Sequence, residues 1–254
     1  MTKNKDAWSG KEYHKHSSTQ HQGGLAALAD YPFRGNEWVL DVGCGTGKTA
    51  AVIAAKVAHG RVIGIDASHS MIHEAQRTYG TVKNLTFMLQ DAATFHFEEK
   101  FDLIVSFFAV HWMKDQLAVF KHMHAALKPT GKIILRMSGG NQPEINQVFT
   151  GEPWASRIKA QTWQGKTTEE YAALIKVAGF KNIDACTEWH AQMFASKQAL
   201  LDHLMTWMPH ATGLPDDQAL ECAQSLAQRV MKAQKSAEGS IELRSPMAII
   251  EATV

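Results

Sequence analysis

The sequence predicts an α/β protein with a mostly parallel sheet and helices on both of its faces. Three observations predict this fold class. Short apolar runs typical of buried strands alternate with segments of helical periodicity through the first half of the chain. A glycine-rich turn joins the first such strand to the helix behind it. The chain has 254 residues, 45% of them hydrophobic, so it can bury a core on each side of a sheet.

The first half contains five apolar runs with the length of strands. These expected strands are Trp38–Val42, Arg61–Asp66, Leu85–Leu89, Phe101–Phe107 and Lys132–Met137. The segments between them have helical character. The expected helices are Lys48–Val57, a helix that Ser68 caps and that ends near Tyr79, and the amphipathic Met113–Leu127. A turn is expected over Lys128–Gly131 because it holds Pro129 and Gly131.

The regular alternation stops after Ser138, and residues 143–166 carry no clear strand. Thr167 and Glu170 have the spacing of a capping box, which predicts a helix ending at Ala178. Two more helices and two strands are expected beyond it. They are the helices Ser196–Met208 and Pro215–Lys235 and the strands Ile183–Trp189 and Ile241–Ile250.

Charge and composition limit the possible partners and the compartment. Lys and Arg total 26 against 25 Asp and Glu, so we expect neither nucleic acid nor a membrane surface as a partner. The cysteines Cys44, Cys186 and Cys222 lack metal-ligand spacing, so no metal site is expected. The N-terminus lacks the apolar core of a signal peptide, and no apolar run is long enough to span a membrane. A cytoplasmic protein is therefore expected.

The most informative motif is the glycine-rich segment Val39–Gly47, which connects a strand directly to a helix. A dinucleotide fingerprint fails here because Lys48 occupies the position of its third glycine. A P-loop matches at the end, in Gly47-Lys48-Thr49, but Val42 stands where its first glycine is required.

The pattern D-x-G-x-G-x-G matches at every position, with Asp41, Gly43, Gly45 and Gly47. This segment resembles the first motif of class I S-adenosylmethionine-dependent methyltransferases. The resemblance implies a Rossmann-like, seven-stranded, mostly parallel sheet with a helical cap inserted in the C-terminal half. It also implies S-adenosyl-L-methionine as the cofactor, with Asp41 near the methionine ammonium group.

Further cofactor residues follow from the same resemblance. Asp66 closes the second strand, where the family's acid accepts hydrogen bonds from the ribose hydroxyls. Asp91 follows the third strand, where a polar group reaches the adenine amino group, and Ser106 lies at the methionine end. We assign four more residues to the cofactor site, with Tyr13 as a lid. They are Tyr13, Ala67, Met71 and Ala92.

The segment from Phe101 to Trp112, followed by Leu127–Gly131, is similar to a group of carboxyl methyltransferases. The group comprises trans-aconitate, malonyl-acyl-carrier-protein and juvenile hormone acid methyltransferases. The last two share the pair His111-Trp112, while Thr130 replaces the family's usual glycine. The resemblance implies a small or carrier-protein-bound organic acid as acceptor and a monomer or dimer.

A carboxylate acceptor is already ionised at neutral pH, so it needs no general base. Gln20 and Trp112 are candidate donors to it, since the matching residues in the juvenile hormone enzyme are thought to hold the substrate carboxylate. His111 either orients the acceptor, serves as a base for a hydroxyl substrate, or is structural. Arg136 lies near the C-terminal end of the fifth strand. It could pair with a second carboxylate or phosphate, or form a surface salt bridge.

Several alternatives stay open. The acceptor could be another nucleophile, such as a phenol or amine, or the protein could bind a nucleotide or the cofactor without transferring a methyl group. Five large residues of the second half either line an apolar pocket or form plain core: Trp154, Trp163, Met193, Trp207 and Met208. Lys232 and Lys235 mark either a solvated helix face or a patch for an acyl carrier protein.

We expect one domain over residues 1–254. Its parts are a helical N-terminal lid over 1–37, a cofactor-binding core over 38–137, a partly helical acceptor-side cap over 138–235 and a final strand within 236–254.

Overall fold

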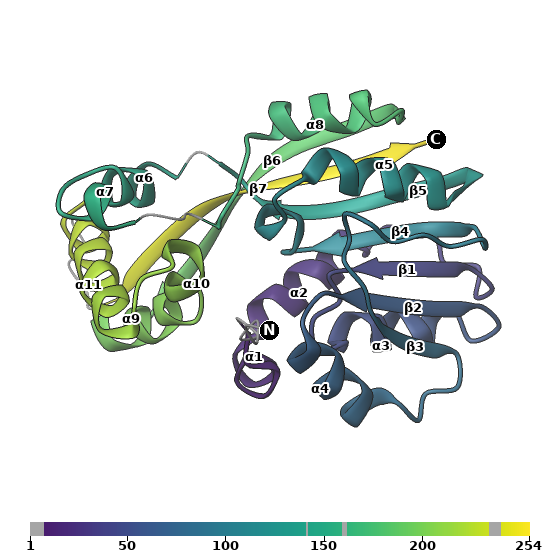
Figure 1. The fold of residues 1–254 in the computed structure, drawn as a ribbon, viewed down its shortest axis with the longest axis horizontal. Helices are drawn as coiled ribbons and strands as arrows, with labels where there is room; N and C mark the ends of the chain where they lie inside the picture. Colours follow the sequence, from purple (N-terminus) through teal and green to yellow (C-terminus); the bar gives the residue numbers. More distant parts are fainter. Residues whose placement is uncertain (1–7, 141, 159–161, 234–239) are drawn as a thin grey trace, which may run out of the picture.

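The computed structural model describes residues 8–140, 142–158, 162–233 and 240–254. Its centre is a seven-stranded sheet with the order β3-β2-β1-β4-β5-β7-β6 (Figure 1). The strands are β1 Trp38–Val42, β2 Arg61–Asp66, β3 Leu85–Leu89, β4 Phe101–Phe107, β5 Leu127–Ser138, β6 Lys181–Phe194 and β7 Ile241–Thr253. Strands β1 to β5 pair in parallel, and β7 runs antiparallel to both of its neighbours. This is the Rossmann-like, mostly parallel arrangement that the resemblance implied.

The chain crosses from one half of the sheet to the other at β1, which pairs with β2 on one side and β4 on the other. In open α/β sheets, such a switch point leaves a crevice at the carboxyl ends of the strands, where ligands bind. The glycine-rich segment lies at this crevice, since it follows β1 directly.

Helices cover both faces because successive strand residues point to opposite sides. Leu40 belongs to the core beneath α5 Gln116–Ala126 and α8 Thr168–Val177. Its neighbour Val39 belongs to the core beneath α3 Lys48–Lys56 and α4 His69–Tyr79. Each large apolar side chain fully buried in this way stabilises the fold by about 1.5–3 kcal/mol.

A separate group of helices packs around its own apolar core beyond the sheet (Figure 1). We call this group the cap; its helices are α6 Pro143–Phe149, α7 Trp154–Arg157, α9 Lys197–Met205, α10 Met208–Thr212 and α11 Asp216–Ala233. Two long strands reach it from the sheet. Residues Met247–Thr253 of β7 pair with both β5 and β6, whereas Ile241–Pro246 pair with β6 alone. This two-stranded arm carries the cap toward the carboxyl edge of the sheet.

Two N-terminal helices, α1 Gly10–His16 and α2 Ser18–Ala27, lie between the cap and the carboxyl edge of the sheet (Figure 1). The backbone N–H of Gly10 donates to Ser70 Oγ at the start of α4 over 2.7 Å. No helix in the described parts of the chain combines the length and apolarity needed to cross a membrane.

The structure confirms the bounds predicted for β1 to β4 and for α4, and it contains the capping box of Thr167 and Glu170. The turn predicted over Lys128–Gly131 is wrong, because these residues belong to β5 as a bulge. While β4 advances from Phe101 to Leu103, its partner advances from Leu127 to Lys132.

Other predicted elements have different ends. The predicted helix Ser196–Met208 is two helices, α9 and α10. The helix predicted from Met113 begins at Gln116, where Asp115 accepts a hydrogen bond from the N–H of Ala118, and a 3₁₀ turn over Val110–Trp112 precedes it. Both late strands are longer than predicted. Lys235 lies outside the described residues.

Candidate active site

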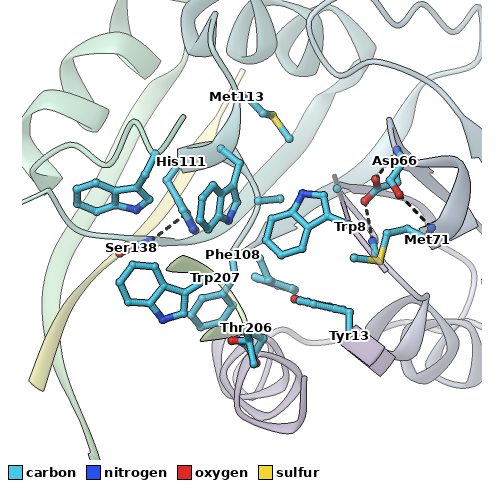
Figure 2. A pocket seen from close by; sticks show the side chains of 18 of the residues that line it. Trp8, Tyr13, Asp66, Met71, Phe108, His111, Met113, Ser138, Thr206 and Trp207 are labelled. Atoms are coloured by element: carbon cyan, nitrogen blue, oxygen red, sulfur yellow. Dashed lines mark hydrogen bonds between the residues drawn. The ribbon is translucent and has the colours of Figure 1, made fainter. Parts of the chain in front are cut away.

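A cavity of about 800 Å³ opens at the carboxyl edge of the sheet, bounded by the N-terminal helices and the cap. Figure 2 shows Asp66 and Met71 at one side of it and Trp207 at the other, with Trp8 between them. The cavity is within the size range of small-molecule sites. We call the part near Asp66 the cofactor side and the part near the cap the acceptor side.

The glycine-rich loop forms one wall of the cofactor side. Gly45 has φ +53°, and a Cβ there would meet only the Tyr13 ring, at 3.6 Å. A ligand can therefore approach the Gly45 backbone closely. Gly47 serves packing instead, because its Cβ would lie 2.4 Å from the Phe87 ring.

The carboxylate of Asp66 fixes this loop. One of its oxygens accepts the N–H of Gly45 and the other accepts the N–H of Ser68, each over 2.9 Å. Ser68 in turn caps α4 by accepting the N–H of Met71 over 3.1 Å. A carboxylate can accept about four hydrogen bonds, so these two are compatible with holding a pair of ribose hydroxyls.

The end of β3 supplies the next wall. Asp91 is exposed and accepts the N–H of Ala93 over 2.8 Å, and Ala92 and Gln90 also line the cavity. The Oε1 atom of Gln90 is buried without a hydrogen-bond donor in the described structure. A buried acceptor costs free energy until it is paired, which suits a ligand with an amino group at this point.

Asp41 lies beneath the loop, 3% exposed. Burial, together with the negative charge of Asp66, raises the pKa of its carboxyl to about 7. The charged side chains that line the cavity, among the residues that the structure describes, are Asp66 and Asp91, and no Lys, Arg or Glu joins them. The residues present therefore fit a cationic ligand with a ribose and an amino-bearing base, such as S-adenosyl-L-methionine.

The N-terminal segment covers the cofactor side. The pKa of the half-buried Tyr13 is raised, by desolvation first and by Asp66 second, so its phenol stays neutral. Trp8 meets the Tyr13 ring edge-on at 5.9 Å and the Trp112 ring at 5.3 Å. It also stacks on His210 of the cap, with ring centroids 4.0 Å apart. Trp8 thus connects the lid, the acceptor side and the cap (Figure 2).

His111 is 4% exposed in the turn after β4, and burial lowers its pKa to about 3. The backbone N–H of Ser138 donates to its Nδ1 over 3.3 Å, as drawn in Figure 2. The neutral ring then carries its proton on Nε2, so it is a hydrogen-bond donor rather than a base. Trp112 lies beside it at 5.3 Å. Gln20 lines the cavity from α2, with a buried Oε1 that has no described partner.

Arg136 is 6% exposed, and its Nη1 pairs with Glu188 Oε2 over 3.2 Å. Its guanidinium lies 6.0 Å from the ring of Phe108, which lines the cavity in a left-handed conformation with φ +55°. Arg136 is not among the described lining residues. The structure therefore places it beside Phe108 and in an ion pair with Glu188.

The cavity brings together eleven of the residues assigned from the sequence. They are Tyr13, Gln20, Gly43, Gly45, Asp66, Ala67, Met71, Asp91, Ala92, His111 and Trp112. Four others, Asp41, Gly47, Ser106 and Arg136, are absent from its described lining. Ser106 is fully buried and donates to the carbonyl of Val42 over 2.7 Å, which ties β4 to β1.

Sequence reasoning missed most of the acceptor side. Trp163 and Trp207 line the cavity, whereas Trp154 and Met208 are buried in the cap core and Met193 is 60% exposed. Five polar residues from the arm and the cap also line it: His190, Gln192, His203, Thr206 and Ser245. Nowhere in the described structure do three His, Cys, Asp or Glu side chains gather as a metal site would require.

Comparison with known proteins shows which class of protein this chain is similar to. Residues 39–131 match the family model of the methyltransferase domain. The chain is 33% identical over 101 residues to malonyl-[acyl-carrier protein] O-methyltransferase 1 of Ilyobacter polytropus, covering 40% of this chain and 38% of that one. It is 28% identical over 208 residues to trans-aconitate 2-methyltransferase of Shigella flexneri, covering 82% and 79%. The chain spans about half the length, or less, of several of the first curated relatives it matches.

Solved structures share the fold. The YcgJ protein of Bacillus subtilis superposes with a TM-score of 0.68 at 18% identity, covering 92% of this chain and 98% of that one. Phosphoethanolamine N-methyltransferase 2 of Haemonchus contortus, in complex with S-adenosyl-L-methionine, gives 0.60 at 21% identity, covering 93% and 52%. With the glycine loop and its acids, these findings support a class I S-adenosylmethionine-dependent methyltransferase, the class that the sequence resembles.

The raised pKa of Asp41 generates a prediction with opposite effects on stability and binding. Between pH 4 and pH 7 the folded protein holds a proton that the unfolded chain has lost, so stability falls as pH rises through this window. We expect Asp41→Asn to raise Tm at pH 8 by roughly 2–4 °C for each 1 kcal/mol relieved, and to leave Tm at pH 4 unchanged. The variant should also weaken S-adenosylmethionine binding about tenfold or more, because it removes a charge that the cationic ligand stabilises.

Thermal unfolding at both pH values and calorimetric titration measure these two effects. The exposed Asp30→Asn is the matched control, and it should change neither. An Asp41→Asn variant that keeps full cofactor affinity, or that loses stability at pH 8, would show that Asp41 does not act as a buried counter-charge.

Proposed function

We propose that this protein transfers the methyl group of S-adenosyl-L-methionine to the carboxylate of a small or carrier-bound organic acid. The observation that carries this proposal is the state of His111. Its Nδ1 accepts the Ser138 N–H and burial holds its pKa at about 3, so the histidine beside Trp112 donates a hydrogen bond and is a poor base. A carboxylate needs such donors and no base, whereas a phenol or a protonated amine needs a base.

The cofactor supplies an electrophilic methyl group on a sulfonium. The protein has to place a carboxylate oxygen in line with that methyl group and to exclude water. Trp112 offers an indole N–H and His111 an Nε2–H, and Gln20 offers a carboxamide from α2. Tyr13 and Trp8 cover the cofactor side. Since opposite charges disappear during the transfer, a water-poor aromatic site favours it.

The relatives support the same chemistry. Two of the proteins similar to this chain are named as methyltransferases of trans-aconitate and of a malonyl group on acyl carrier protein, and both acceptors are carboxylic acids. Similarity to the second covers only part of the chain, and the carrier-bound form of the acceptor is therefore the less supported of the two.

The pH dependence of turnover tests the nature of the acceptor. At saturating cofactor, we expect kcat to be flat between about pH 6 and pH 9, because a carboxylate with a pKa of about 4 is fully ionised there. A phenol or amine acceptor would instead give kcat rising roughly tenfold per pH unit below its own pKa. Such a rising limb, measured with initial rates of methyl transfer, would contradict carboxyl methylation.

Substitution of Trp112 tests the donor assignment. We expect Trp112→Phe to lower kcat/KM for the acid by about tenfold, since it removes one hydrogen bond to a charged group. The affinity for S-adenosylhomocysteine should stay within about twofold of the parent protein. Trp189→Phe is the control, because Trp189 is 61% exposed on β6. Equal losses for acid and cofactor would instead place Trp112 in the cofactor site.

A further inference from the structure

The acceptor side of the cavity has a polar end that the methyl transfer itself does not use. It is formed by His190 and Gln192 of β6, Ser245 of β7, and His203 and Thr206 of α9 and its end. We call these five residues the distal cluster. Figure 2 shows Thr206 and Trp207 on the opposite side of Trp8 and Tyr13 from Asp66, so the cluster's helical part lies away from the cofactor side.

The register of the arm aims part of the cluster at the cavity. His190 pairs with Ser245, and Gln192 pairs with Leu243. Paired residues share a face of a sheet, and residues two apart along a strand share it as well. The arm therefore turns its polar side chains inward, while Trp189 and Met193, one residue to either side of this set, are 61% and 60% exposed.

The cap brings a second histidine to the same place. His203 lies near enough to His190 for the charge of His190 to lower the pKa of His203, and the His203 ring is 5.2 Å from the ring of Phe194. Burial is the larger cause, and together they lower the pKa of His203 to about 4. His203 is therefore uncharged at neutral pH and can both donate and accept hydrogen bonds.

The cation near the cluster is Arg136, whose buried Nε has no hydrogen-bond partner in the described structure and which is not among the described lining residues. Glu188, two residues before His190, pairs with Arg136. No Lys, Arg or Glu stands among the described lining residues. The lining also includes the apolar and aromatic Phe108, Trp163 and Leu243, and the polar pair Ser138 and Gln142, in which Gln142 Nε2 donates to Ser138 Oγ over 2.8 Å. A second carboxylate placed here would have no Lys or Arg among the described lining residues to balance it, so binding it would require a histidine of the cluster to take up a proton.

We propose that the acceptor is an elongated apolar acid with one carboxylate and, at its other end, an uncharged hydrogen-bonding group such as a hydroxyl, which the distal cluster binds. This inference rests on the proposed carboxyl methylation. It makes His190 and His203 specificity-determining residues, and it separates this chain from an enzyme for a tricarboxylate.

Three matched acids test the proposal. They are a straight-chain monocarboxylic acid, the ω-hydroxy acid of the same length, and the corresponding α,ω-dicarboxylic acid, each offered over a series of lengths. We expect the hydroxy acid to give kcat/KM about tenfold above the plain acid, the difference that one satisfied hydrogen bond makes. The diacid should fall at least tenfold below the plain acid. A preference for the diacid, or for a tricarboxylate, would overturn the inference.

His190→Phe and His203→Phe keep an aromatic ring and remove its hydrogen bonds. Each should bring the hydroxy acid and the plain acid to within about twofold of one another, with cofactor affinity unchanged. The exposed His59→Phe is the control. If a phenylalanine variant loses thermal stability, Ser245→Ala and Gln192→Leu probe the same cluster. A hydroxyl preference that survives all of these variants would overturn the assignment.

Binding without turnover separates this inference from the proposed function. The hydroxy acid can be titrated calorimetrically into the protein loaded with S-adenosylhomocysteine. Binding that His203→Phe weakens, in a protein that methylates no acid, would support the distal cluster and overturn carboxyl methylation. Methylation of all three acids at similar rates would support carboxyl methylation and overturn the distal cluster.

Discussion

The rest of the site depends on the two hydrogen bonds that the Asp66 carboxylate accepts from the backbone N–H groups of Gly45 and Ser68. They join the loop after β1 to the loop after β2, at the point where the order of the sheet reverses. Hydrogen bonds to an ionised carboxylate are among the stronger ones in proteins. Because both loops are fixed by one side chain, the Gly45 backbone, the start of α4 and the Tyr13 ring above them keep their relative positions.

The Asp66 carboxylate also destabilises the ionised form of Asp41 beside it, and a cationic cofactor can offset this repulsion. Burial first and the charge of Asp66 second raise the pKa of Asp41, and no Lys or Arg is among the described residues that line the cavity. Folding thus leaves negative charge under the glycine loop that a sulfonium and an ammonium group can neutralise. Sites that bind charged ligands are often destabilised in this way when empty.

The acceptor side depends on a different constraint, the length of β6 and β7. Both strands continue past the end of β5, and this extension holds the cap over the carboxyl edge of the sheet. The acceptor side of the cavity therefore has two polar groups of residues: His111 and Trp112 from the turn after β4, and His190 and His203 from the arm and the cap. In the two proposals made above, the turn after β4 serves the chemistry and the arm and the cap determine selectivity.

The sheet and the cofactor loop could be predicted from sequence because their signals are local. Each of β1 to β4 is one apolar run, and the loop after β1 needs glycine at Gly43, Gly45 and Gly47, which all have positive φ. The inward side of the arm could not be predicted. His190 faces the cavity because it pairs with Ser245, 55 positions later in the chain. The sequence of either strand alone does not indicate this register.

Arg136 illustrates the same limit. Its position at the end of β5 left two roles open, an acceptor contact or a salt bridge. The structure contains a salt bridge, and its partner, Glu188, lies on a strand that is not a neighbour of β5 in the sheet. The Pro and Gly of Lys128–Gly131 suggested a turn for a related reason, since a bulge in β5 absorbs them only when β4 is beside it.

One measurement tests the central claim most directly. An ω-hydroxy acid offers the protein a carboxylate and a hydroxyl on the same molecule, and S-adenosylmethionine labelled with deuterium in its methyl group marks which of them reacts. We expect mass spectrometry to find the labelled methyl as an ester on the carboxylate, which mild base removes. A labelled methyl ether that resists base would contradict both the donor role of His111 and carboxyl methylation.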